Sequence, residues 1–263
     1  MKSLIKPFYH RLINKRDMFL PSNIRHDDVF IVEFPKSGIT WFSTMLANLL
    51  CLLNDRDIGV TFFNIHQFIP EFDRRGGSIG PSLLQYPGYR FLKSHSRYNP
   101  KFRQVIYLLR NPYSVMQSYY QHEIRRGAFE GSLEHFIEDK KRGIESYKKH
   151  VESWMMNDIS PTRLHLIRYE DLRAHTITEF MDLSKNLGLA RVDQNIVENA
   201  ISSSEIENMR ASESLYSKRH PSYRSGFVRT GQVMPTTEEM PDQVRSRIKQ
   251  AANPVLEEFY SDL

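Results

Sequence analysis

Short apolar segments rich in β-branched residues alternate along this chain with longer segments that have helical periodicity. The run from Val29 to Phe34, bounded by an acidic pair and a proline, is typical of a short buried strand. Three more strands are expected at residues 89–93, 104–109 and 163–169, and helices at residues 40–53, 112–126, within 132–157 and from 170 onward. This alternation predicts an α/β fold, a single domain with a central parallel sheet flanked by helices. Ligands of such sheets bind beyond the carboxyl ends of the strands.

The pattern weakens at the start of the chain and in two internal segments. Residues 1–27 are expected to be an N-terminal leader, and residues 28–263 to form the α/β domain. Residues 54–88 and 205–228 are expected to be irregular. The longest apolar run has about ten residues, against the roughly 20 needed to cross a bilayer. We therefore expect no membrane span and a cytoplasmic protein.

Composition limits the chemistry that this chain can carry. The 263 residues include 36 Lys and Arg against 31 Asp and Glu. This mild excess of +5 suits an anionic ligand without requiring nucleic acid or a membrane surface. The single cysteine, Cys51, lies in an apolar run. It is expected to be a buried core residue, and it excludes an internal disulfide or a cysteine-based zinc site.

The turn after the first predicted strand is the strongest candidate for an anion site. It spans residues 35–40 and contains Lys36, Ser37, Gly38 and Thr40. Unpaired amides at the start of a helix attract anions, and the lysine and hydroxyls add a charge and donors. Because the lysine precedes the only glycine, the turn differs from the Gly-x-x-x-x-Gly-Lys-Ser/Thr loop, and ATP and GTP are disfavoured. An ordinary strand–turn–helix with a chance lysine is the alternative.

Two pairs of residues follow other predicted strands. Arg110 and Ser118, about two helical turns apart, could grip a second phosphate; a helix-capping arginine and a surface serine are the alternative. Lys93 and His95 share a face of an extended segment. A cation beside an imidazole suits proton removal from a hydroxyl while charge builds on a leaving group, although a histidine can also be structural. The sequence has no His-x-x-x-His or His/Asp cluster with metal spacing, so no metal is expected.

These elements, in this order, resemble the sulfotransferases that use 3′-phosphoadenosine-5′-phosphosulfate (PAPS). Residues 35–41 (Pro-Lys-Ser-Gly-Ile-Thr-Trp) are similar to the family's 5′-phosphosulfate loop, and residues 93–95 (Lys-Ser-His) to its Lys-Thr-His strand. Arg110 and Ser118 have the spacing of its 3′-phosphate site. Residues 168–172 and 203–206 resemble segments that contact the adenine. The resemblance covers residues 28 to 260 and implies the P-loop-like sulfotransferase fold.

The resemblance implies a donor site and catalytic groups. PAPS is the implied co-substrate and adenosine 3′,5′-bisphosphate (PAP) the product, without a metal. The implied donor-binding residues are Lys36, Ser37, Gly38, Ile39, Thr40, Trp41, Arg110, Ser118, Tyr169, Ser204, Arg229, Thr230 and Gly231. The implied catalytic residues are Lys36, Lys93 and His95. The neighbouring Glu170 and Asp171 are expected to cap the next helix rather than to act in the chemistry.

In the implied mechanism, an acceptor hydroxyl attacks sulfur in line and PAP leaves. His95 would take the hydroxyl proton, Lys36 would meet the charge on the bridging oxygen, and Lys93 would support it. Trp41 is expected to pack against the adenine, with core packing as the alternative. The acceptor, a small molecule or glycan with a hydroxyl or an amine, cannot be read from the sequence.

The sequence departs from the family pattern in four places. Ile39 replaces a threonine of the loop, which removes a hydroxyl but leaves the backbone amide for the donor. Ile206 replaces an aromatic adenine contact. A late family motif is degraded, with residues 229–231 (Arg-Thr-Gly) as its best match and residues 224–226 as a competing register. The dimerisation segment is not recognisable, so the oligomeric state stays open.

Three other functions fit the sequence less well than sulfonate transfer. A P-loop kinase would need a lysine after a second glycine and a magnesium-binding aspartate, and neither is found. A non-catalytic nucleotide-binding protein on the same scaffold is disfavoured by the retained Lys36, Lys93 and His95. A nucleic-acid-binding module is remote because the charge is modest and no reader motif is present.

Overall fold

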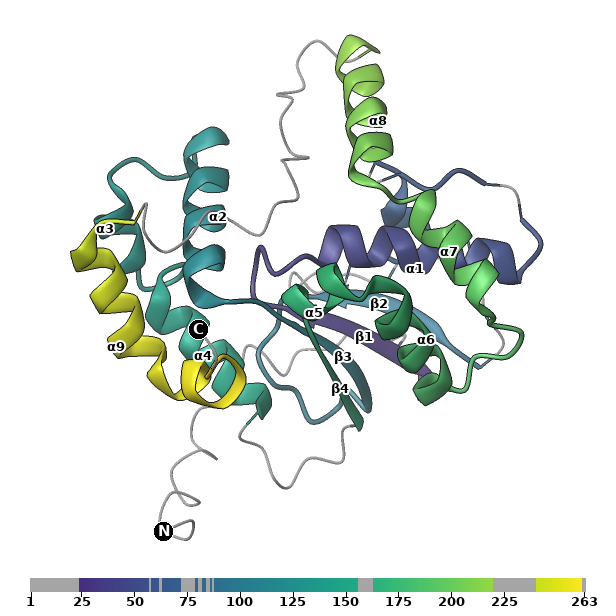
Figure 1. Ribbon diagram of the computed structural model, residues 1–263, viewed down its shortest axis with the longest axis horizontal. Coiled ribbons are helices and arrows are strands. Elements are labelled where there is room, and N and C mark those ends of the chain that lie inside the picture. The colour runs from purple at the N-terminus through teal and green to yellow at the C-terminus, as the bar shows by residue number, and fades with distance from the viewer. Residues whose placement is uncertain are drawn as a thin grey trace, which may run out of the picture.

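Four parallel strands form the central sheet of the protein in a computed structural model (Figure 1). The structure describes residues 24–56, 58–61, 63–71, 79, 82–83, 86, 88–155, 163–219 and 240–261. The strands are β1 (Asp28–Glu33), β2 (Arg90–Ser94), β3 (Gln104–Leu109) and β4 (Arg163–Arg168). Each strand predicted from the sequence is confirmed, with ends that differ by at most one residue.

The strand order β2-β1-β3-β4 places β1 between β2 and β3. In the register, Val32 of β1 lies beside Ser94 of β2 and Tyr107 of β3. The segments that follow these three strands therefore leave the sheet at the same edge. Those segments hold the residues that the sequence analysis selected, as expected for the carboxyl edge of a parallel sheet.

Helices follow β1, β3 and β4 along the chain, whereas β2 leads to β3 without a helix between them. The helices are α1 (Ile39–Leu53), α2 (Pro112–Arg125), α3 (Leu133–Ile137), α4 (Ile144–Met155), α5 (Tyr169–Ala174), α6 (Thr176–Leu187), α7 (Gln194–Ser202), α8 (Ile206–Arg219) and α9 (Asp242–Phe259). A short 3₁₀ turn, η3, covers Ile65–Gln67. None of the helices in the described ranges is long and apolar enough to cross a membrane.

The helices cover both faces of the sheet (Figure 1). Val29 and Ile31 of β1 point to the face covered by α1, α6 and α7, whereas Phe30 and Val32 point to the face covered by α2, α4 and α9. Because successive side chains of a strand point to opposite faces, one apolar strand supplies both cores. The α/β fold with a central parallel sheet flanked by helices is thus confirmed.

One sequence expectation needs correction. The segment 205–228 was expected to be irregular, but residues 206–219 form α8, which extends away from the sheet (Figure 1). This segment has no apolar stripe, so its hydrophobic periodicity did not indicate a helix. Many of its residues nevertheless have high helix propensity. The helices expected within 132–157 are confirmed as α3 and α4, and a Cβ on Gly143, which lies between them, would clash with the carbonyl oxygen of Ile137.

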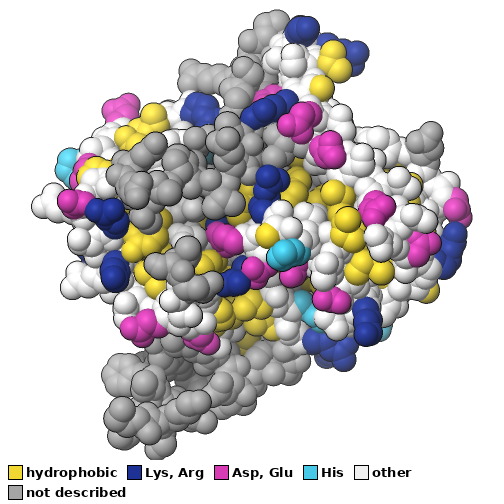
Figure 2. All heavy atoms as spheres, viewed as in Figure 1, with side chains coloured by type: hydrophobic (Ala, Val, Ile, Leu, Met, Phe, Trp, Pro, Cys, Tyr) yellow, Lys and Arg dark blue, Asp and Glu magenta, His cyan; other side chains and the backbone are white. Residues whose placement is uncertain are grey.

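Charge is spread evenly over the face drawn in Figure 2. Acidic and basic side chains are interspersed among the described residues of that face, in keeping with the small net charge of +5. The predicted leader, residues 1–27, lies outside the described residues except for its last four.

Candidate active site

The turn between β1 and α1 has an unusual backbone that two residues define. Lys36 has a φ of 81° and Gly38 a φ of 113°, both in the left-handed region. A Cβ on Gly38 would lie 2.6 Å from Cδ2 of Tyr169, so the ring of this tyrosine rests directly on the glycine backbone. The glycine is therefore required for both its conformation and its lack of a side chain.

The amides of this turn are divided between the protein interior and the outside. Ser37 closes the turn, because its amide and its hydroxyl both donate to the carbonyl of Phe34, at 3.2 and 2.9 Å. Within the described part of the chain, the amides of Gly38, Thr40 and Trp41 donate no hydrogen bond. Donors left open at the start of a helix are the groups that bind anions.

The remaining two amides contact a residue that the sequence analysis did not select. The buried carboxylate of Glu33 accepts from Lys36 N at 3.1 Å and from Ile39 N at 2.8 Å. The expectation that the Ile39 amide faces the donor is therefore wrong in this structure. The signal in the sequence was a single charged residue within the apolar run Val29 to Phe34.

Arg110 connects this turn to the end of β3. Its Nη1 donates to the carbonyl of Lys36 at 3.0 Å, and its guanidinium carbon lies 4.2 Å from the centre of the Tyr169 ring. The residue is only 7% exposed, and Nε is buried without a partner among the described residues. A buried guanidinium N–H without an acceptor is costly, which indicates a position prepared for an anion.

A buried network holds the turn that carries Arg110. The hydroxyl of Tyr147 donates to the Arg110 carbonyl at 2.8 Å. Glu170 accepts from Asn111 N at 3.1 Å and from the hydroxyl of Tyr260 at 3.0 Å. The expected capping role of Glu170 is thus wrong, because its carboxylate is used to fasten the β3–α2 turn.

The structure also shows which side chains cap the helices next to this turn. The side chain of Asn111, not Arg110, caps α2 by accepting from Tyr113 N at 2.9 Å. Asp171 pairs with Arg168 at 2.6 Å, and no side chain forms a cap hydrogen bond at the start of α5. The capping expected of Asp171 is therefore wrong as well.

One face of α2 looks toward the β1–α1 turn. Ser118 is 9% exposed, and His122 lies one helical turn further on the same face. Burial, together with the nearby charge of Lys36, lowers the pKa of His122 to about 4. Because the charge of Lys36 reaches His122, the face of α2 that carries His122 and Ser118 lies toward the β1–α1 turn.

Lys93 and His95 meet the same two carboxylates at the end of β2. His95 Nδ1 lies 3.3 Å from the Glu33 carbonyl, and Nε2 lies 3.9 Å from Glu71 Oε1. Burial lowers the pKa of Lys93, while the charges of Glu71 and Glu33 act in the opposite direction. The predicted pairing of Lys93 with His95 on one side of the segment agrees with these shared partners.

Trp41 and Ser204, both expected near the adenine, differ in how far they are buried. Trp41 is half-buried, edge-on to Tyr169 at 6.0 Å between ring centres, and the Arg173 guanidinium lies 5.0 Å from its ring. Ser204 is fully buried; its hydroxyl donates to the Ala200 carbonyl and accepts from Asn48 Nδ2. Ser204 therefore joins α7 to α1.

The residues of the degraded late motif, Arg229, Thr230 and Gly231, were also expected to bind the donor. They lie outside the described residues.

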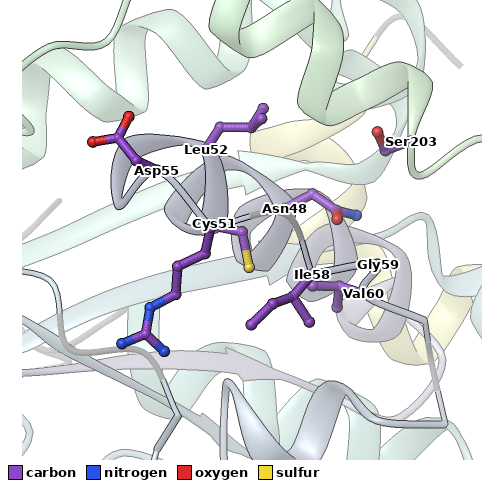
Figure 3. Close-up of a pocket in the computed structure, with 9 residues that line it drawn as sticks. Asn48, Cys51, Leu52, Asp55, Ile58, Gly59, Val60 and Ser203 are labelled. Carbon is purple, nitrogen blue, oxygen red and sulfur yellow. The ribbon is translucent and has the colours of Figure 1, made fainter.

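A separate pocket of about 450 Å³ lies beside the second half of α1 (Figure 3). Asn48, Cys51 and Leu52 line it from α1, and Ser203 lines it from the end of α7. None of the predicted donor-binding residues lines it. Burial raises the pKa of Cys51 to about 11, which agrees with the expected unreactive thiol.

A parallel α/β sheet with an anion-binding turn between β1 and α1 is the arrangement expected of the family named in the sequence analysis, and a comparison with known protein families gives the same family. Residues 26–259 match the family described as the sulfotransferase domain, and the chain belongs to that family.

Relatives with known names are similar over part of their length. Sulfotransferase 4A1 from mouse, rat and human is 30% identical over 181 residues, 64% of this chain. The chain spans only 62% of the length of these relatives. Bovine sulfotransferase 1E1 is 27% identical over 221 residues, which are 78% of this chain and 73% of that protein.

Solved structures show the same fold at low sequence identity. Retinol dehydratase, in complex with androsterone and inactive cofactor PAP, has a TM-score of 0.68 at 14% identity, over 95% of this chain and 85% of that one. A mouse sulfotransferase complexed with PAP has a TM-score of 0.63 at 19% identity, over 94% and 89% of the two chains.

Proposed function

We propose that this chain is an enzyme that transfers a sulfonate group from PAPS to the hydroxyl or amine of an acceptor. The observation that carries the proposal is the meeting of Lys36, Lys93 and Arg110 at one edge of the sheet, with a histidine between carboxylates beside them. Cations around an anion site favour a charged phosphate or sulfate group and make a metal unnecessary.

The described residues fit the phosphates of such a donor. The open amides of Gly38, Thr40 and Trp41 and the charge of Lys36 suit the 5′-phosphosulfate. The buried Nε of Arg110, which has no acceptor among the described residues, suits the 3′-phosphate. Ser118 adds a hydroxyl from α2. Trp41 offers a half-buried ring for the adenine, and PAPS supplies the electrophilic sulfonate.

The contacts of His95 support a role as the general base. Because a carbonyl oxygen only accepts, the contact with the Glu33 carbonyl assigns the proton to Nδ1 and leaves the lone pair on Nε2. Nε2 then takes the acceptor proton as the acceptor oxygen bonds to sulfur and the bond from sulfur to the bridging oxygen breaks. Lys36 meets the charge that collects on that bridging oxygen, and Lys93 supports it.

The acceptor class stays broad. The neighbouring structures hold androsterone with retinol dehydratase, and retinol in a second complex. Such molecules make a small hydroxyl compound a reasonable first acceptor to test, and a glycan hydroxyl the second. Much of residues 54–88 and 205–228, which were expected to line the acceptor pocket, lies outside the described residues.

The decisive experiment is an acceptor screen with PAPS, with mass spectrometry to detect the added sulfonate. In wild type we expect a sulfonated product and PAP in equal amounts. His95→Ala should lower turnover by about 10²–10⁴-fold and leave PAP affinity nearly unchanged. His175→Ala, at the junction of α5 and α6, is the matched control and should retain turnover.

Metal independence is tested by calorimetry with PAP in the presence of a chelator. We expect the same affinity with and without chelator. PAP binding without transfer to any acceptor would favour a non-catalytic nucleotide-binding protein. Binding of ATP with magnesium in preference to PAP would favour a P-loop kinase.

A further inference from the structure

Glu33, the last residue of β1, places a buried carboxylate inside the candidate active site. We propose that Glu33 is a positioning residue, which fastens the donor-binding turn and orients His95; the assignment rests on the proposed function. Glu33 is 2% exposed, and a buried carboxylate is unfavourable unless it is paired or hydrogen-bonded. Its partners, Lys36, Ile39 and His95, all belong to the site.

The carboxylate spans the turn from one side to the other. Oε1 accepts from Lys36 N at 3.1 Å, and Oε2 accepts from Ile39 N at 2.8 Å. Two amides therefore face inward, and those of Gly38, Thr40 and Trp41 are left for a ligand. Glu33 in this way decides which donors of the turn are presented to the phosphosulfate.

The same contact holds Lys36 in a conformation that it would otherwise leave. The left-handed region is unfavourable for a residue other than glycine, because the Cβ lies too close to the following carbonyl oxygen. At Lys36, where φ is 81°, Glu33 accepts from the amide and Arg110 donates to the carbonyl. Because both peptide groups beside this Cα are held, the lysine side chain leaves the turn in a fixed direction, as a catalytic cation requires.

Glu33 also contacts His95 in two ways. Its carbonyl lies 3.3 Å and its Oε1 lies 3.9 Å from Nδ1 of the imidazole. The carbonyl assigns the tautomer, and the carboxylate stabilises the positive charge that the ring acquires when Nε2 takes a proton. Glu71, the other carboxylate near the ring, has a side chain that is 55% exposed, so water screens its charge more strongly.

The test compares Glu33→Gln with Asp28→Asn, a control at the opposite end of β1. Asp28 is equally buried and paired, but with Arg90, which lies away from the site. Using the acceptor identified by the screen, we expect Glu33→Gln to lower turnover at saturating PAPS about 100-fold. PAP affinity should fall by less than about tenfold, because the cations remain. Asp28→Asn should lower thermal stability and retain turnover per folded molecule.

Turnover of Glu33→Gln close to that of wild type, or no lower than that of Asp28→Asn, would overturn the proposal and leave the proposed function intact. A second measurement needs neither acceptor nor variant. Long-range ¹H–¹⁵N spectra of the nucleotide-free wild type should show neutral His95 with its proton on Nδ1. A proton on Nε2 would overturn the placement of the ring against Glu33, even if Glu33→Gln did not fold. Failure of the wild type to bind PAP would argue against the proposed function. The spectra would still test the placement of the His95 ring against Glu33.

Discussion

Gly38 shows most directly how a single residue adapts this chain to its ligand. It combines a φ of 113° with an aromatic ring that rests directly on its backbone. The ring is that of Tyr169, which also lies under the Arg110 guanidinium. The glycine thus allows the β1–α1 turn, the β3–α2 turn and the start of α5 to meet.

Gly38→Ala should destabilise the protein by about 2–4 kcal/mol, from left-handed strain and from overpacking against Tyr169. Gly127→Ala is the matched control, since Gly127 has a φ of 66° but no atom within 4 Å of the added Cβ. It should lose only the strain, about 1–2 kcal/mol. Urea unfolding of both variants measures the difference. Equal losses would show that Tyr169 yields to the new side chain.

Arg110→Ala should weaken PAP binding by about 1.5–3 kcal/mol, the contribution of a charge-assisted hydrogen bond. Its buried Nε and its contact with the Lys36 carbonyl are the physical reason. Thr230→Ala, in the degraded late motif, should weaken binding less, because a hydroxyl offers at most a neutral contact. Calorimetry with PAP compares the two. Similar losses would mean that the late motif is still used.

At the scale of elements, α4 and the residue that follows α9 hold the β3–α2 turn of the site in place. Tyr147 of α4 donates to the Arg110 carbonyl, and Tyr260, which follows α9, donates to Glu170. The two helices pack on the same face of the sheet. The position of the β3–α2 turn is therefore set by elements that lie far from it in sequence.

Tyr147→Phe should cost about 1–3 kcal/mol of stability, because it leaves the Arg110 carbonyl buried without a donor. It should also weaken PAP binding by several fold, since Arg110 is then held less firmly. Tyr107→Phe is the control: Tyr107 is equally buried, but its hydroxyl bonds to His150 rather than to the Arg110 carbonyl. Chemical unfolding and calorimetry should separate the two variants. A loss of PAP affinity in both would assign the effect to general loosening.

For the whole molecule, His122 makes the free energy of unfolding depend on pH below neutrality. The folded state lowers the pKa of His122 to about 4 from 6.5, so protonation favours the unfolded chain between these values. Stability from this residue is present above pH 6.5 and is lost as pH falls toward 4. His122→Gln should flatten that loss in urea unfolding from pH 7 to 4. Parallel curves for wild type and variant would contradict the prediction.

The parts of the molecule that could be predicted share a physical reason. The strands, α1 and α2 are buried on a regular period, so the spacing of Val29, Ile31 and their counterparts reports them directly. Glu33 could not be assigned, because its role depends on amides and a histidine that only the fold brings together. The helix α8 was missed because it buries no regular stripe. Motif residues at strand ends were found because topology, rather than packing detail, gathers them.

The position of Trp41 gives this protein an optical reporter. The chain has two tryptophans, and the other, Trp154, is buried in the core beneath α9, with its indole N–H on the Ser96 carbonyl. In Trp154→Phe, the emission would come from a single indole beside Tyr169 and Arg173. An adenine stacked on that indole should quench and shift its emission as PAP is added. Trp41→Phe should stay silent in the same titration, so a spectrofluorometer could follow nucleotide exchange in real time without a label.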